Sequence, residues 1–63
     1  MPNRPPAAFS EGQRVRVVGA RRLGTVRSAR WHFQAERYDY YLEGEDGRKD
    51  PTPYSEADLQ PAG

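Results

Sequence analysis

Aromatic and arginine side chains are the residues of this chain best suited to binding. Trp31 and Phe33 lie two positions apart, and Tyr54 follows a proline-rich stretch. Aromatic faces bind proline-rich peptides, methylated lysine or flat rings. Together with the adjacent pair Arg21 and Arg22, they form a candidate surface for a ligand or partner. The alternative for Trp31 is structural, because a small core uses a large aromatic side chain to close one end.

Positive charge is concentrated in the first part of the chain. Residues 1–37 hold eight arginines and two glutamates, a net charge of +6, whereas residues 38–63 carry −5 and the whole chain +1. A nucleic-acid backbone attracts such a cluster, and aromatic side chains stack on bases. Non-specific nucleic-acid binding is therefore one interpretation, and its candidate residues are Arg14, Arg16, Arg21, Arg22 and Arg27.

The other interpretation is that the two halves of the chain pair with each other. Arg14, Arg16 and Arg27 would then lie opposite Asp39 and Glu43 across neighbouring strands. This pairing is favoured, because nucleic-acid binders have an excess of basic charge over the whole domain. It explains the loop arginines at positions 21 and 22 least well.

Groups suited to acid–base catalysis or to metal binding are few. His32 is the single histidine, and no carboxylate is placed to orient it as a general base. The carboxylates at positions 43, 45, 46 and 50 flank an expected turn, without an apolar pocket to raise a pKa. The absence of cysteine excludes disulfides and thiolate metal sites. These residues favour a binding or assembly module over an enzyme.

Three stretches alternate with the period of two that predicts half-buried strands. The residues between them are rich in glycine and charge, as turns are. The strands are expected at residues 13–18 with Val15 and Val17 inward, at residues 24–31 with Val26 inward, and at residues 38–43 with Tyr38, Tyr40 and Leu42 inward.

The second half of the chain predicts a hairpin and closing elements. Asp46-Gly47 is a strong hairpin signal and predicts a type I′ turn. A fourth strand is expected from Arg48 to Tyr54, at a rim because its two prolines lack the donor that a sheet ladder needs. Ser55 is the expected N-cap of one 3₁₀ turn, and a brief closing strand follows at residues 60–61.

Several short strands joined by tight turns indicate a small closed barrel. Closure removes the exposed edges that so short a sheet cannot otherwise protect. The predicted fold is all-β, a small five-stranded SH3-like barrel with one short 3₁₀ turn. The predicted organisation is a flexible proline-rich tail at residues 1–8, the barrel at residues 9–60 and a second tail at residues 61–63.

The length of 63 residues allows one domain of marginal stability, which buries about 60% of the unfolded surface. Without disulfides or a metal, self-association is the remaining means of support. No segment approaches the roughly 20 apolar residues of a membrane span, and no signal-peptide pattern opens the chain. The expected location is cytoplasmic, with an unknown protein or a second copy as partner and no membrane.

Five short motifs, taken together, resemble a known enzyme family. Their order and spacing are similar to those of the type B dihydrofolate reductases, the small plasmid-borne enzymes behind trimethoprim resistance. The match spans nearly all of residues 9–59. The motifs are FSEGQRVR at residues 9–16, GTV at 24–26, ERY at 36–38, PTPY at 51–54 and ADL at 57–59.

The resemblance implies an SH3-like barrel and a homotetramer around one pore, where NADPH and dihydrofolate bind. The pore segment of that family falls here on Thr52, Pro53 and Tyr54, and its ligand-attracting lysine falls on Val17. Only the tyrosine matches. Thr52 stands where that family has a glutamine, whose side-chain amide both donates and accepts hydrogen bonds. Pro53 has no backbone N–H to donate.

Three functions follow from these patterns. The first is a non-catalytic SH3-like binding or assembly module without a cofactor, which uses Trp31, Phe33, Tyr54, Arg21 and Arg22. The second is an NADPH-dependent dihydrofolate reductase of the type B kind. The third is non-specific nucleic-acid binding through the basic first half of the chain.

Overall fold

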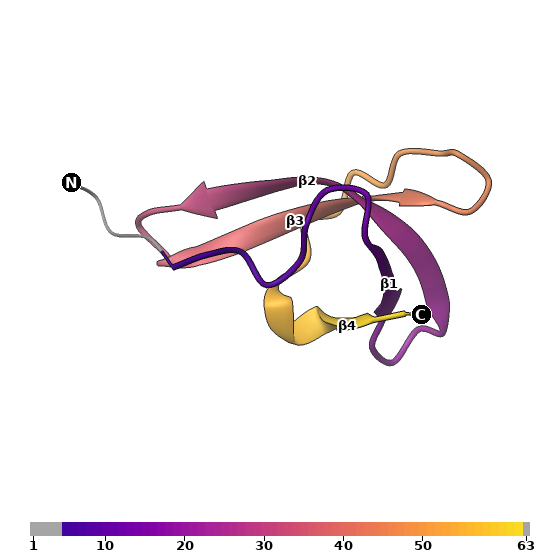
Figure 1. Cartoon of the computed structure of the whole chain (residues 1–63), viewed down its shortest axis with the longest axis horizontal. Helices are drawn as coiled ribbons and strands as arrows, with labels where there is room; N and C mark the ends of the chain where they lie inside the picture. The colour runs from indigo at the N-terminus through magenta and orange to yellow at the C-terminus, as the bar shows by residue number, and fades with distance from the viewer. Residues whose placement is uncertain (1–4, 63) are drawn as a thin grey trace.

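A four-stranded antiparallel sheet makes up most of this small, mostly-β domain (Figure 1). The computed structural model describes residues 5–62. The strand order is β3-β2-β1-β4, so the last strand of the chain lies beside the first. The elements are β1 at Arg14–Val17, β2 at Arg22–His32, β3 at Arg37–Gly44, the 3₁₀ turn η1 at Glu56–Asp58, and β4 at Leu59–Pro61.

The inward faces predicted for the first three strands are confirmed. Val15 and Tyr40 are completely buried, and Val26 is 1% exposed. Among the described residues, no polar or charged residue is buried, so the core is held together by apolar and aromatic packing. The core consists of Phe9, Val15, Val17, Val26, Tyr38, Tyr40, Leu42, Tyr54 and Leu59.

A β-bulge at Arg27 reverses the alternation of β2. Val26 faces the core before the bulge, and Ala29 and Trp31 pack against the core after it. One extra residue shifts a period of two by one position, so every later side chain changes face. Trp31 thus lies opposite Tyr38 instead of pointing outward from the other face.

The segment expected as a fourth strand is interrupted. It meets β3 at two isolated bridges, Glu43 with Lys49 and Tyr40 with Tyr54. Two extra residues lie between these bridges on the outer segment, and the exposed residues 51–53 bulge away from β3. Proline has no N–H to continue a ladder. The described chain therefore has four strands in its sheet, not the predicted five, and its ladder is not closed.

The turn after β3 differs from the one predicted. The N–H of Gly47 donates to the carbonyl of Gly44 at 2.9 Å, and the N–H of Gly44 donates to the carbonyl of Arg48 at 2.8 Å. Gly47 has a φ of 83°, whereas Asp46 does not have a positive φ. A type I′ turn needs positive φ at both central positions, so that prediction is wrong.

The predicted 3₁₀ turn is confirmed, with Ser55 as its N-cap. The carboxylate of Asp58 accepts hydrogen bonds from the N–H and the hydroxyl of Ser55, both at 3.1 Å. Leu59 then enters β4 opposite Val17. No helix within residues 5–62 is long and apolar enough to cross a membrane. Residues 1–4 of the first predicted tail and residue 63 of the second lie outside the described residues.

Candidate binding sites

The predicted binding residues lie at two places near opposite ends of β2. Trp31 and the neighbouring Phe33 lie where β2 turns into β3. Arg21 and Arg22 lie where β2 begins, and Tyr54 reaches this end through its hydroxyl. The sequence alone does not show that these residues form two separate sites, because the distance between them depends on the length of β2.

The first place is a groove of about 340 Å³ between the end of the β2–β3 hairpin and η1. Trp31 and Tyr38 meet there edge to face, with ring centroids 5.1 Å apart. Trp31 is half-buried and Phe33 is 74% exposed. The groove is lined by Pro5, Trp31, Glu36, Arg37, Tyr38, Ser55, Glu56 and Ala57.

The amino-terminal segment of the chain itself borders this groove at Pro5. The hydroxyl of Tyr38 donates to the carbonyl oxygen of Pro5 at 2.7 Å. The N–H of Ala8 donates to the hydroxyl of Tyr40 at 2.9 Å, and that hydroxyl donates to Glu56 Oε2 at 2.9 Å. Two tyrosines of one strand thus bind backbone groups of one extended segment, which Figure 1 shows running along the β2–β3 hairpin.

Burial and the hydrogen bond to Glu56 together raise the pKa of Tyr40 above its usual value. The phenol therefore keeps its proton through the neutral range. This proton makes the bond to Glu56, and the phenol oxygen accepts from Ala8. The site therefore provides a bound backbone with a donor, the hydroxyl of Tyr38, and with an acceptor, the hydroxyl oxygen of Tyr40.

His32 points into its own turn. Its Nδ1 accepts a hydrogen bond from the N–H of Ala35 at 3.2 Å, so its ring shapes the turn between β2 and β3. In the same turn, Glu36 has a left-handed φ of 53°. This geometry gives His32 a structural role within the turn.

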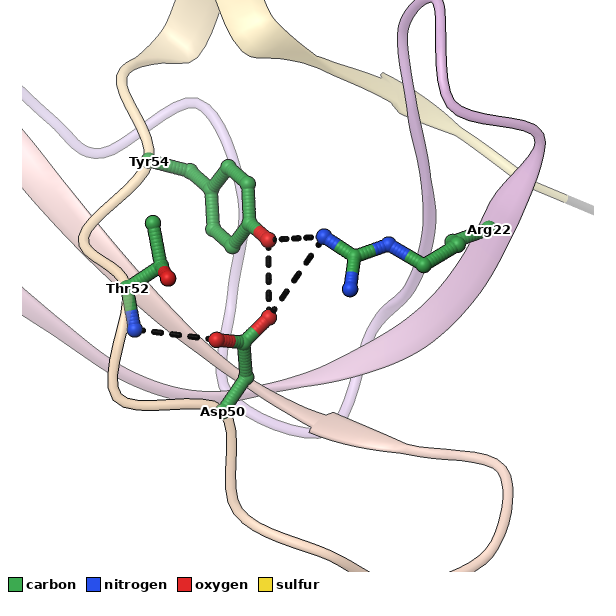
Figure 2. Close-up of polar contacts among 4 residues, drawn as sticks. All are labelled: Arg22, Asp50, Thr52 and Tyr54. Carbon is green, nitrogen blue, oxygen red and sulfur yellow. Dashed lines mark hydrogen bonds and ion pairs between the residues drawn. The ribbon is translucent and has the colours of Figure 1, made fainter.

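The second place is a network of Arg22, Asp50, Thr52 and Tyr54 (Figure 2). The hydroxyl of Tyr54 donates to Asp50 Oδ2 at 2.7 Å and accepts from the guanidinium of Arg22. Asp50 also pairs with Arg22 at 3.8 Å and accepts at Oδ1 from the N–H of Thr52 at 2.9 Å. Both oxygens of this carboxylate have partners.

The network fixes the protonation of two of its members. The N–H of Thr52 and the hydroxyl of Tyr54 lower the pKa of Asp50, which is therefore charged at neutral pH. Burial and the same bond to Asp50 raise the pKa of Tyr54. A charged acceptor with a neutral donor is a strong hydrogen-bond pair, and the guanidinium of Arg22 contacts both members of it.

An open cavity of about 550 Å³ lies beside this network. Its apolar lining comes from Val17, Leu23 and Leu42, and its charged lining from the two loops on either side. Arg21 belongs to that lining and has a left-handed φ of 54°. The charged residues of the lining are Arg21, Arg22, Glu45, Asp46, Arg48, Lys49 and Asp50.

The segment that the reductase resemblance assigns to a pore is divided by the fold. Thr52 and Pro53 are exposed, whereas Tyr54 is 7% exposed and its hydroxyl is bonded within the chain. Val17, at the lysine position, is a core residue that borders the cavity. The reductase, its tetramer and NADPH binding remain predictions from the resemblance.

The arginines proposed for nucleic-acid binding have varied surroundings. Arg14 pairs with Glu45 at 3.3 Å, and the guanidinium of Arg27 lies 6.0 Å from the ring centre of Tyr41. Arg16 is exposed on the outer face of β1.

The partners expected for internal charge pairing are wrong. Asp39 lies opposite Arg30, and Glu43 lies opposite Thr25. The predicted cross-strand pairs therefore do not form. Arg14 and Arg16 lie on β1, which does not neighbour β3, and Arg27 lies at the bulge of β2, without a partner residue on β3. Asp39 pairs instead with Arg37 of its own strand, at 3.4 Å.

Sequence reasoning missed the polar groups of the buried tyrosines and their partners. Tyr38 and Tyr40 were expected only as core residues, yet a buried tyrosine hydroxyl finds a hydrogen-bond partner. That rule was the available signal for a role at the groove. Asp50, which precedes Pro51, has the side chain that commonly bonds the backbone two residues on.

Comparisons of the chain with known protein families, with curated proteins and with solved structures found no match.

Proposed function

We propose that this chain is a non-catalytic SH3-like binding module that holds an extended, proline-containing segment in the groove between Trp31, Tyr38 and η1. The observation that carries the proposal is the hydrogen bond from the hydroxyl of Tyr38 to the carbonyl of Pro5. The chain's own segment marks the chemistry that fits this groove.

The path of the chain supports an SH3-like barrel as the finer description of the fold. β4 covers the outer edge of β1, and residues 48–54 cover the outer edge of β3 through two bridges. The 3₁₀ turn connects these two covering segments. Consecutive segments of the chain thus run along the outer side of β3 and the outer side of β1, an arrangement close to the closed five-strand barrel.

Three properties of the groove support an extended proline-containing ligand. The edge-to-face pair of Trp31 and Tyr38 gives an apolar wall against which a proline ring packs. The hydroxyl of Tyr38 donates to a carbonyl, the one backbone group that proline retains. Tyr40 and Glu56 then accept from the N–H of Ala8, three residues after Pro5, at 2.9 Å and 3.4 Å.

The proposal is tested by titrating decaproline into the full chain and recording the emission of Trp31, the single tryptophan. A saturable change in this emission is expected at millimolar decaproline, because the chain's own amino-terminal segment competes with the peptide at a millimolar effective concentration. In the Pro5→Gly/Pro6→Gly variant, whose own segment is the weaker competitor, Tyr38→Phe should weaken binding of decaproline about 3- to 10-fold, the effect of one hydrogen bond. Arg16→Gln, on the exposed face of β1, is the matched control and should bind like the parent chain.

An equally long glutamine–alanine peptide distinguishes proline recognition from general stickiness. Equal binding of the two peptides would refute the proposed ligand class. Emission that does not change with decaproline, in both the parent chain and a Pro5→Gly/Pro6→Gly variant, would refute the site.

A further inference from the structure

We infer that the cavity beside the Arg22–Asp50–Tyr54 network is a second, separate binding site, and that it takes a small organic anion with a carboxylate or phosphate group on a compact apolar body. The cavity lies between the turn joining β1 to β2 and the loop at residues 44–50. It shares no lining residue with the aromatic groove.

The charges around the cavity are not balanced. Each acidic residue of the lining has an ion pair: Glu45 with Arg14, Asp46 with Arg48, and Asp50 with Arg22. Among residues 5–62, Arg21 and Lys49 have no carboxylate within 4.0 Å. Both of these cations border the cavity. An anionic group placed there meets two unpaired positive charges.

The backbone of Arg21 supports the same conclusion. Its φ of 54° lies in the left-handed region, which residues other than glycine, asparagine and aspartate rarely adopt. Such a conformation is unfavourable, and it clusters at functional sites. Here it occurs at the residue whose charge has no partner within the described chain.

Arg22 adds a donor that is already oriented. Its guanidinium donates to Tyr54 and pairs with Asp50, and these contacts restrict the side chain although it is 60% exposed. A guanidinium has five N–H donors, and the contacts to Tyr54 and Asp50 go through one terminal nitrogen. Further N–H groups are left for a ligand whose oxygens accept in pairs.

The size and lining of the cavity define the rest of the ligand. A volume of about 550 Å³ is in the range of small-molecule sites. Leu23 is partly exposed and supplies apolar surface, and the buried side chains of Val17 and Leu42 border the cavity behind it. A small flat or branched apolar body fits this lining, with its anionic group toward Arg21 and Lys49.

The test is an NMR titration of the ¹⁵N-labelled full chain with phenyl phosphate, and separately with inorganic phosphate. Phenyl phosphate should shift the amide signals of Gly24 and Gly44 in a saturable way, and it should bind several-fold more tightly than inorganic phosphate because its ring contacts the apolar lining. The signals of Trp31 and Tyr38 should stay in place. This separates the site from the groove of the proposed function.

The decisive variant is Arg21→Asn/Lys49→Gln, because asparagine tolerates the left-handed backbone. It should bind phenyl phosphate at least 10-fold more weakly, whereas Arg16→Gln/Arg30→Gln removes the same charge elsewhere and should bind like the parent chain. The single variant Lys49→Gln serves if the double variant fails to fold.

Three results would overturn the inference. One is the absence of saturable shifts at Gly24 and Gly44, and another is equal weakening by the two double variants. The third is equal affinity for phenyl phosphate and inorganic phosphate, since the apolar lining would then have no part in binding.

Discussion

The hydroxyl of Tyr38 and the carbonyl of Pro5, 33 positions apart in the chain, are joined by a hydrogen bond of 2.7 Å. A side chain of the central hairpin therefore holds the amino-terminal segment. Because Pro5 and Pro6 have no N–H, the carbonyl is the backbone group through which this part of the segment is bound.

Tyr38→Phe should release the segment without unfolding the domain. The phenylalanine ring keeps the contact with Trp31 but loses the donor, at a cost of about 1 kcal/mol in the free energy of unfolding. Amide exchange at Ala7 and Ala8 should become faster, while exchange in β1 stays slow. Unchanged exchange at these two alanines would show that the bond to Pro5 does not hold the segment.

Tyr54→Phe should destabilise the fold in a pH-dependent way. The substitution removes one of the donors that lower the pKa of Asp50. A lowered pKa gives stability that is present above the ordinary value, near 4, and is lost as the pH falls through the folded value. Urea unfolding should therefore show a loss of about 1 kcal/mol at pH 7 that shrinks toward pH 2.

The matched control for Tyr54→Phe is Tyr41→Phe. Tyr41 lies on the other side of β3, and its hydroxyl has no part in the network. Its loss should not change the pH dependence of unfolding. A Tyr54→Phe loss of equal size at pH 2 and pH 7 would exclude Asp50 as the cause.

The folded chain should lose stability in alkali. The pKa values of Tyr40 and Tyr54 are raised, first by burial and then by their bonds to Glu56 and Asp50. Stability from a raised pKa is complete below the unfolded value, about 10, and is lost as the pH rises through the folded value. The absorbance of phenolate at 295 nm should therefore rise together with unfolding at pH values above 10. Gradual ionisation of these two tyrosines in a chain that stays folded would contradict this.

Insertion of one alanine between Ser28 and Ala29 should disrupt the groove, because one further residue reverses the alternation again and turns Trp31 away from the core. The emission of Trp31 should shift to longer wavelength, and the midpoint of thermal unfolding should fall by several degrees or more. Arg27→Ala keeps the bulge and loses only the contact with Tyr41. It should leave the emission unchanged.

The strands and inward faces could be predicted because alternation is a local property of the sequence. Val15, Val17, Tyr38, Tyr40 and Leu42 all lie where the period of two places them. The bulge could not be predicted in this way, because nothing in residues 24–31 marks where one extra residue enters. The face of Trp31 is therefore a result of tertiary packing.

The candidate sites were harder to predict than the fold. Arg22, Asp50 and Tyr54 come from three separate positions, and only the path of residues 48–54 along β3 brings them together. The turn at Gly47 shows a related difficulty. Asp-Gly fits more than one type of hairpin turn, and the register of the flanking segments decides between them.

The bulge at Pro51–Pro53 has a consequence for how copies of this chain meet in concentrated solution. It occupies the side of β3 on which a foreign strand would otherwise add, and two of its three residues have no amide hydrogen to offer. Growth of ordered fibrils by strand addition is blocked at this side. Any assembly that includes this side must therefore depend on side-chain contacts.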